Sequence, residues 1–121
     1  MNSKRLSILG LFAVTLIANN SIAHTRLRVN REIQKRQLVR RVEPIYPEEA
    51  KARQIRGIVT VEIFIGADGH VKSAKLISGH PLLGQAALDA VMQWVYRPTI
   101  SSGAAAEVLT TDYVVVQPHN R

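Results

Sequence analysis

The sequence has no cysteine among its 121 residues. This absence excludes disulfide bonds, thiol catalysis and thiolate metal sites, so the stability of the fold must come from packing alone. The sequence also lacks an acidic surplus, an internal repeat and any proline-rich tract that would form a stiff spacer. An apolar share of 46% is still enough for a folded core, which indicates one small domain.

Catalytic and metal-binding patterns are also absent from the sequence. The four histidines are scattered, without a pair at i, i+4 spacing and without a carboxylate cluster nearby. There is no Gly-x-Ser-x-Gly elbow and no glycine-rich phosphate loop. The sequence therefore predicts a protein that is not an enzyme and that uses no metal and no cofactor.

Long hydrophobic runs are limited to one stretch near the N-terminus. Leu6 to Ala18 is apolar but shorter than the roughly 20 residues that a membrane-spanning helix needs. Lys4 and Arg5 precede it, and Ser21-Ile22-Ala23 places small residues where a signal peptidase cleaves. We therefore expect residues 1–23 to be a signal peptide for export to the periplasm, with a short uncleaved inner-membrane anchor as the alternative. Either topology places the remaining chain outside the cytoplasm.

Positive charge dominates the chain, whose formal net charge is +7. The surplus is concentrated in residues 24–41, a basic lead-in in which Glu32 is the only acidic residue. This lead-in is either a solvated tether with a marginal helix or a patch for acidic lipid headgroups or cell-wall polymer. Nucleic acid is not an expected partner, because the exported segment has no aromatic side chains to stack on bases. The candidate residues for binding an acidic surface are Arg26, Arg28, Arg31, Lys35, Arg36, Arg40 and Arg41.

Helix signals occur twice within residues 42–117, the expected folded domain. Pro47 suits the first turn of a helix that would run to about Arg56. A second helix is expected over about 82–95, where apolar residues recur at helical spacing, and Pro98 would end it.

Strand signals surround the second helix. Residues 58–65 alternate between apolar and polar side chains, and a tight Asp-Gly turn over 66–69 leads to a second strand over 71–77. A last strand is expected over 107–116, followed by a polar tail at 118–121. This order predicts an α+β fold in which two helices pack on a three-stranded antiparallel sheet.

Two short motifs flank these elements. Pro44-Ile45-Tyr46-Pro47 precedes the first helix, and Trp94-Val95-Tyr96-Arg97-Pro98 closes the second. Together with the strand over 57–65 and its Gly-Ala-Asp-Gly turn, they make residues 42–116 resemble the C-terminal domain of TonB. The resemblance implies the same α+β fold and a role in energy-coupled uptake across the outer membrane.

The resemblance also implies where a partner would bind. In the TonB family the last strand accepts the TonB-box peptide of an outer-membrane transporter as an added strand, and the Pro-x-Tyr-Pro segment lies near that surface. A sheet edge suits this mode of binding because its N–H and C=O groups are unpaired. The implied partner-binding residues are Tyr46, Pro47, Leu109, Thr111, Tyr113 and Val115.

Several alternatives remain open at this stage. Tyr46 and Pro47 form a rigid turn in the simplest interpretation, and Trp94, Tyr96 and Pro98 are expected to be structural anchors that close the helix onto the sheet. The edge of the last strand could instead be capped by the chain's own tail or by a second copy in a homodimer. The whole chain could also be an anchored mini-transducer working with inner-membrane motor proteins, or a structural envelope protein that holds cell wall through its basic segment.

Overall fold

The structure is a computed structural model that describes residues 25–119. The expected signal peptide lies outside the described residues. None of the helices within residues 25–119 is long and apolar enough to cross a membrane. The elements in chain order are β1 (Arg26–Arg28), α2 (Arg31–Lys35), β2 (Leu38–Arg40), α3 (Glu48–Ala52), β3 (Gly57–Ile65), β4 (Val71–Ser78), α4 (Pro81–Val91), β5 (Val95–Tyr96), β6 (Thr99–Ser101) and β7 (Ala104–Val116).

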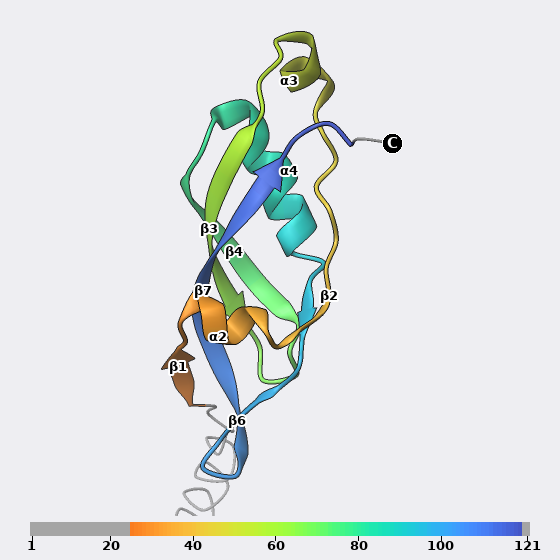
Figure 1. Cartoon of the computed structure of the whole chain (residues 1–121). Helices are drawn as coiled ribbons and strands as arrows, with labels where there is room; N and C mark the ends of the chain where they lie inside the picture. Colours follow the sequence, from red (N-terminus) through yellow and green to blue (C-terminus); the bar gives the residue numbers. More distant parts are fainter. Residues whose placement is uncertain (1–24, 120–121) are drawn as a thin grey trace, which may run out of the picture.

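The main sheet has the strand order β1-β7-β3-β4 (Figure 1). Its three long strands, β4, β3 and β7, pair antiparallel as predicted, and β1 joins β7 in parallel. A short hairpin joins β6 to the start of β7, and a separate two-stranded ladder joins β2 to β5. The α+β class is confirmed, with more strands than the three that the sequence predicts.

The long hairpin of β3 and β4 follows from the alternation of the sequence. Each apolar side chain on the helix-facing side of β3 is at most 1% exposed, so these side chains form the centre of the core. The turn that follows has Gly69 at a φ of +90°, the backbone conformation for which glycine is suited. The core residues contributed by β3 are Val59, Val61, Ile63 and Ile65.

Helix α4 packs on the same side of the sheet as this core (Figure 1). It begins at Pro81, and the Nδ1 atom of His80 accepts a hydrogen bond from the Leu82 N–H at 3.1 Å, which caps the first turn. The helix ends at Val91, so the prediction that it extends to Val95 is wrong. Residues after Val91 turn away to form β5, because pairing with β2 holds that segment extended.

The first predicted helix is also shorter than expected. Helix α3 ends at Ala52, and Gln54 follows with a positive φ of 55° that cannot continue a helix. The prediction that this helix extends to about Arg56 is therefore wrong.

The basic lead-in of residues 24–41 is not a free tether over its described part. It forms β1, α2 and β2, all of which contact the domain. The C=O of Gln37 accepts a hydrogen bond from the Arg97 N–H at 2.7 Å, next to the β2–β5 ladder. The expectation of a solvated tether is therefore wrong for residues 25–41, because backbone pairing fixes this segment at both ends.

Candidate functional site

The candidate site is the edge of β7 that faces away from β3. The Glu107 N–H donates to the Thr25 C=O at 2.8 Å, and the Val29 N–H donates to the Leu109 C=O at 3.0 Å. These two hydrogen bonds flank β1, which pairs with Glu107–Leu109. The chain's own lead-in therefore already occupies the first part of the expected 107–116 edge.

The rest of this edge has no strand partner within the described part of the chain. Alternate residues of a strand direct their N–H and C=O groups to the same side, so the outward pattern set by Glu107 and Leu109 continues along β7. No strand among residues 25–119 pairs with the outward groups beyond Leu109. The residues that present these groups are Thr111, Tyr113 and Val115, three of the residues that the resemblance to TonB implied.

Side chains on this part of β7 give the edge a mixed apolar and basic surface. Tyr113 is 50% exposed and Val115 is 44% exposed. The guanidinium of Arg31 lies 4.7 Å from the centre of the Tyr113 ring, at a distance typical of a cation–π contact. The Tyr113 N–H donates to its neighbour's carboxylate, Asp112 Oδ1, at 2.7 Å. A partner strand that bonded this N–H would therefore have to replace or share a local hydrogen bond.

Asp112 itself lies on the opposite, buried side of β7. Its side chain is 6% exposed, and Arg31 Nη1 approaches Asp112 Oδ1 at 3.4 Å. Arg31 thus reaches around the edge of β7, with its charge between a buried carboxylate and an exposed ring. This contact ties α2 to the candidate edge.

Tyr46 and Pro47 are placed at α3, which forms one end of the molecule (Figure 1). The Tyr46 hydroxyl donates to the C=O of Ile55, and the Ala50 C=O lies 3.4 Å from the same hydroxyl. Pro47 precedes the first turn, and its C=O accepts from the Lys51 N–H at 2.9 Å. The contacts of both residues therefore stabilise α3 and its connection to β3.

Trp94 and Tyr96 are buried, at 1% and 2% exposure. The indole Nε1–H of Trp94 donates to the Val42 C=O at 2.9 Å, which fixes the extended segment before α3. Burial raises the pKa of the Tyr96 phenol, and the negative charge of Asp112 raises it further. Pro98 is exposed between β5 and β6, so its contribution is to the backbone rather than to the core.

The basic candidates of the lead-in divide into two groups. Arg26 pairs with Glu107, Arg31 pairs with Glu32 and Asp112, and Arg41 pairs with Glu43. Each of these arginines also lies over an aromatic ring. The remaining four, for which no ion pair occurs within residues 25–119, are Arg28, Lys35, Arg36 and Arg40.

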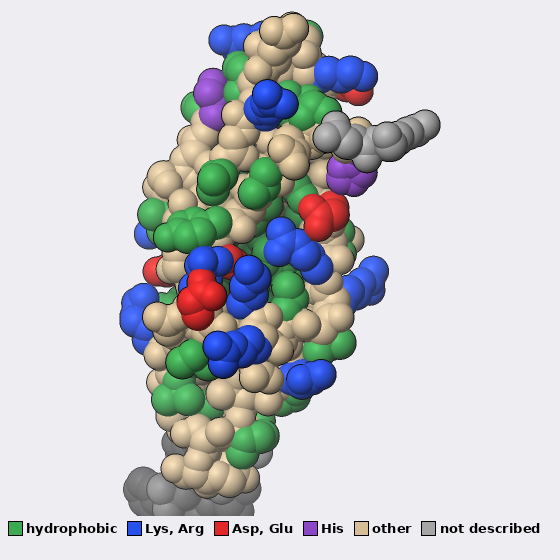
Figure 2. Space-filling model, viewed as in Figure 1, with side chains coloured by type: hydrophobic (Ala, Val, Ile, Leu, Met, Phe, Trp, Pro, Cys, Tyr) green, Lys and Arg blue, Asp and Glu red, His purple; other side chains and the backbone are tan. Residues whose placement is uncertain are grey.

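Figure 2 shows where these charges gather on one face of the molecule. Lys and Arg side chains extend across the middle of this face, at the level of α2 in Figure 1, with few acidic side chains between them. Each side chain that is already paired inside the molecule contributes less to such a surface than its formal charge suggests.

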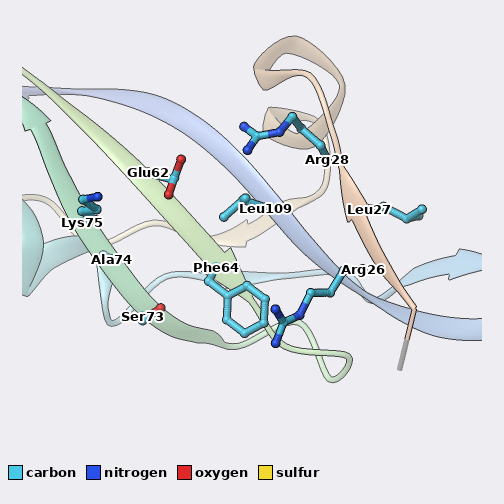
Figure 3. Close-up of a pocket in the computed structure, with 9 residues that line it drawn as sticks. All are labelled: Arg26, Leu27, Arg28, Glu62, Phe64, Ser73, Ala74, Lys75 and Leu109. Atoms are coloured by element: carbon cyan, nitrogen blue, oxygen red, sulfur yellow. The ribbon is translucent and has the colours of Figure 1, made fainter. Parts of the chain in front are cut away.

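A hollow of about 650 Å³ lies on the face of the sheet opposite α4, next to the candidate edge (Figure 3). Arg26 and Arg28 of β1 form one wall, and the guanidinium of Arg26 lies 5.0 Å from the centre of the Phe64 ring. In Figure 3 the side chain of Leu27 points away from the hollow. Ser73, Lys75 and other residues of β3, β4 and β7 complete the lining.

Sequence reasoning missed the part that β1, Phe64 and Glu107 play at this edge. A signal for β1 was present, because Arg26 to Val29 alternates between basic and apolar residues as an exposed strand does. The strong net charge of the lead-in favoured a solvated segment and concealed this alternation.

This edge can bind a partner through its backbone hydrogen-bonding groups and its side chains. No group of three His, Cys, Asp or Glu side chains that could hold a metal ion occurs within residues 25–119. The edge offers hydrogen-bond donors and acceptors of the backbone, exposed apolar side chains and arginines. Such a surface suits an extended peptide that pairs as a strand.

Comparison with known proteins identifies the family. The family model described as "Gram-negative bacterial TonB protein C-terminal" matches residues 42–114. The chain therefore belongs to the family of TonB C-terminal domains, as its motifs suggested.

Individual relatives agree with this assignment. The protein TonB of Vibrio cholerae serotype O1 is 41% identical over 64 residues, which cover 51% of this chain and 26% of that protein. The chain thus matches about a quarter of the relative's length. The solution NMR structure of the Pseudomonas aeruginosa TonB C-terminal domain aligns with a TM-score of 0.56 and 26% identity, covering 69% of this chain and 87% of that one.

Proposed function

We propose that the chain is a non-enzymatic binding module of the periplasm, acting in energy-coupled uptake across the outer membrane. It engages an extended segment of an outer-membrane transporter, of the TonB-box type, by strand addition at the outer edge of β7. Tyr46 and Pro47 support the fold from α3 and flank the partner rather than pair with it.

The observation that carries this proposal is that the outer edge of β7 accepts a strand within this molecule. Backbone hydrogen bonds of 2.8 and 3.0 Å join β7 to the segment around β1. The outward groups of Thr111, Tyr113 and Val115 continue the same edge and have no strand partner among residues 25–119. An added strand there would gain backbone hydrogen bonds without disturbing the β3–β7 ladder.

A proline substitution tests the proposal. Thr111→Pro removes an N–H that faces away from β3, so the fold should persist while the edge loses a donor. Thr111→Ala, which keeps the N–H, is the matched control. Fluorescence anisotropy with labelled synthetic peptides from the N-terminal segments of the source organism's outer-membrane transporters should give weaker binding for Thr111→Pro only. Unchanged affinity in a folded Thr111→Pro variant would refute strand addition at this edge.

The alternative of a structural protein that binds acidic cell wall through its lead-in has less support. Three of its seven basic candidates, Arg26, Arg31 and Arg41, already pair with carboxylates of this domain. The alternative of an anchored mini-transducer depends on residues 1–23, and intact mass of the protein from membrane and periplasmic fractions distinguishes it from an exported module.

A further inference from the structure

β1 is weakly embedded in the sheet. It has three residues, lies at the end of the sheet and, among residues 25–119, pairs only with β7. The side chain of Arg26 is 73% exposed, and Leu27 is only partly buried. By contrast, β3 pairs with β7 along its whole length from Gly57 to Ile65. Separation of β1 would therefore leave the pairing of β7, β3 and β4 intact.

The helix that follows β1 is attached through polar contacts. Gln34 of α2 is 2% exposed, and its Nε2 has no hydrogen-bond partner within the described residues. The residues of β7 at this level include the buried Thr110 and Asp112. A buried donor without a partner lowers the stability of the docked arrangement, so α2 holds the lead-in less firmly than an apolar helix would.

The removal of β1 would not leave the Glu107 carboxylate unpaired. The Glu107 carboxylate is 13% exposed and lies between Arg26 at 3.6 Å and Lys72 at 3.7 Å. Lys72 belongs to the β3–β4 hairpin and stays in place when β1 leaves. Glu107 would thus keep a cation, while the hollow beside Phe64 would lose the wall that Arg26 and Arg28 form (Figure 3).

We propose that β1 is an internal cover of the β7 edge and that the partner strand binds by displacing it. The lead-in and the partner then compete for the outward backbone groups of Glu107 and Leu109. With β1 displaced, the free edge runs continuously from Glu107 to Val115. This edge is longer than the one that is open while β1 is paired with β7. This inference rests on the proposed function, since it concerns how the same edge becomes available.

A reversible crosslink tests the inference. Arg28 and Leu109 are opposite one another in the β1–β7 register, and neighbouring strands lie about 4.8 Å apart, within the range of a disulfide. Because the chain has no cysteine, Arg28→Cys with Leu109→Cys supplies the only thiols. The full chain, with its N-terminus as the cells leave it, is titrated with the same transporter peptides before and after reduction. Oxidation should weaken binding by about tenfold or more, a free-energy difference of at least about 1.4 kcal/mol.

The matched control places the disulfide elsewhere on the same face. Thr60 and Ser78 are register partners in β3 and β4 and do not line the hollow beside β1. Oxidation of Thr60→Cys with Ser78→Cys should leave peptide affinity unchanged. If the oxidised and reduced forms of the Arg28→Cys, Leu109→Cys variant bind the peptide equally well, the inference that the partner displaces β1 is wrong. Absence of binding in every form, including the reduced ones, would instead overturn the proposed function.

A second pair of variants avoids the crosslink. The Leu27 N–H faces β7, by alternation from Thr25 and Val29, whereas the Arg28 N–H faces away. Leu27→Pro should release β1 and strengthen peptide binding, and Arg28→Pro should not. Amide exchange at Val29 should accelerate when peptide binds to the unmodified chain. Unchanged affinity in Leu27→Pro, or unchanged exchange at Val29, would overturn the inference.

Discussion

Gly69 lies where the turn between β3 and β4 touches β5. Its φ is +90°, and its C=O accepts a hydrogen bond from the Tyr96 N–H at 2.8 Å. A Cβ atom at this position would lie 1.9 Å from the Tyr96 carbonyl oxygen. Because that oxygen belongs to the backbone, it cannot rotate away. Gly69→Ala must therefore push the turn and β5 apart.

The cost of Gly69→Ala has three parts. A positive φ costs an alanine about 1–2 kcal/mol. Overpacking against a rigid neighbour costs about 1–3 kcal/mol, and loss of the hydrogen bond to Tyr96 costs about another 1 kcal/mol. The expected loss of unfolding free energy is thus about 3–6 kcal/mol. Gly103 provides the matched control, because its φ is +80° and nothing lies within 4 Å of a Cβ built there. Gly103→Ala should cost only the first part, about 1–2 kcal/mol.

Urea denaturation of both variants and the unsubstituted chain measures this difference. Far-UV circular dichroism reports the whole fold, and the fluorescence of Trp94, which is 1% exposed, reports the region next to β5. In thermal melts, each kcal/mol should lower Tm by about 4–8 °C for a domain of this size. If the two substitutions differ by less than about 0.5 kcal/mol, the reasoning from the Tyr96 contact is refuted.

Other substitutions test the anchors and the polar contacts of the lead-in. Trp94→Phe should cost about 2–3 kcal/mol in urea melts followed by circular dichroism, because it leaves the Val42 C=O without its indole donor. Burial, and to a lesser extent the charge of Asp112, raise the pKa of the Tyr96 phenol in the folded protein. As pH rises, the phenol therefore loses its proton in the unfolded chain before it does so in the folded one. Stability should therefore fall above pH of about 10, and Tyr96→Phe should make that decline shallower when urea midpoints at pH 9 and pH 11 are compared. Gln34→Met should raise the unfolding free energy by about 1 kcal/mol by removing a buried amide donor that has no partner among residues 25–119, and a lower urea midpoint would contradict this.

The sequence predicts the central hairpin and the last strand well because local signals determine them. Alternating branched residues in β3 and the Asp-Gly turn agree with one another, and burial of one face selects their register. Helix ends are predicted less well. The segment Trp94–Tyr96 continues the helical pattern of apolar residues, yet pairing with β2 holds it extended. Long-range pairing of this kind cannot be predicted from the local pattern of apolar residues.

The site is predicted in part. The residues whose backbone groups face outward on β7 follow from the period of two, which the structure retains. The pairing of β1 with Glu107–Leu109 does not follow from this period, because it joins segments that are far apart in the sequence. Tyr46 illustrates the opposite difficulty, since a motif that implies a partner surface has its hydroxyl bonded within the domain.

The position of β1 changes the interpretation of the basic lead-in, because some of its arginines contact the domain itself. From composition alone, a basic segment before a domain is either solvated or attracted to an external acidic surface. Here Arg26 contacts Glu107 and Phe64, and Arg31 contacts Asp112 and Tyr113, so each pairs with a carboxylate and a ring of this sheet. The Arg26 side chain is 73% exposed, so its pair with Glu107 contributes little stability and can hold β1 in the absence of a partner and still release it. Under the proposed displacement, Arg26 is therefore a weak, exchangeable attachment of the chain to the edge of β7 rather than a binding group for an external anion.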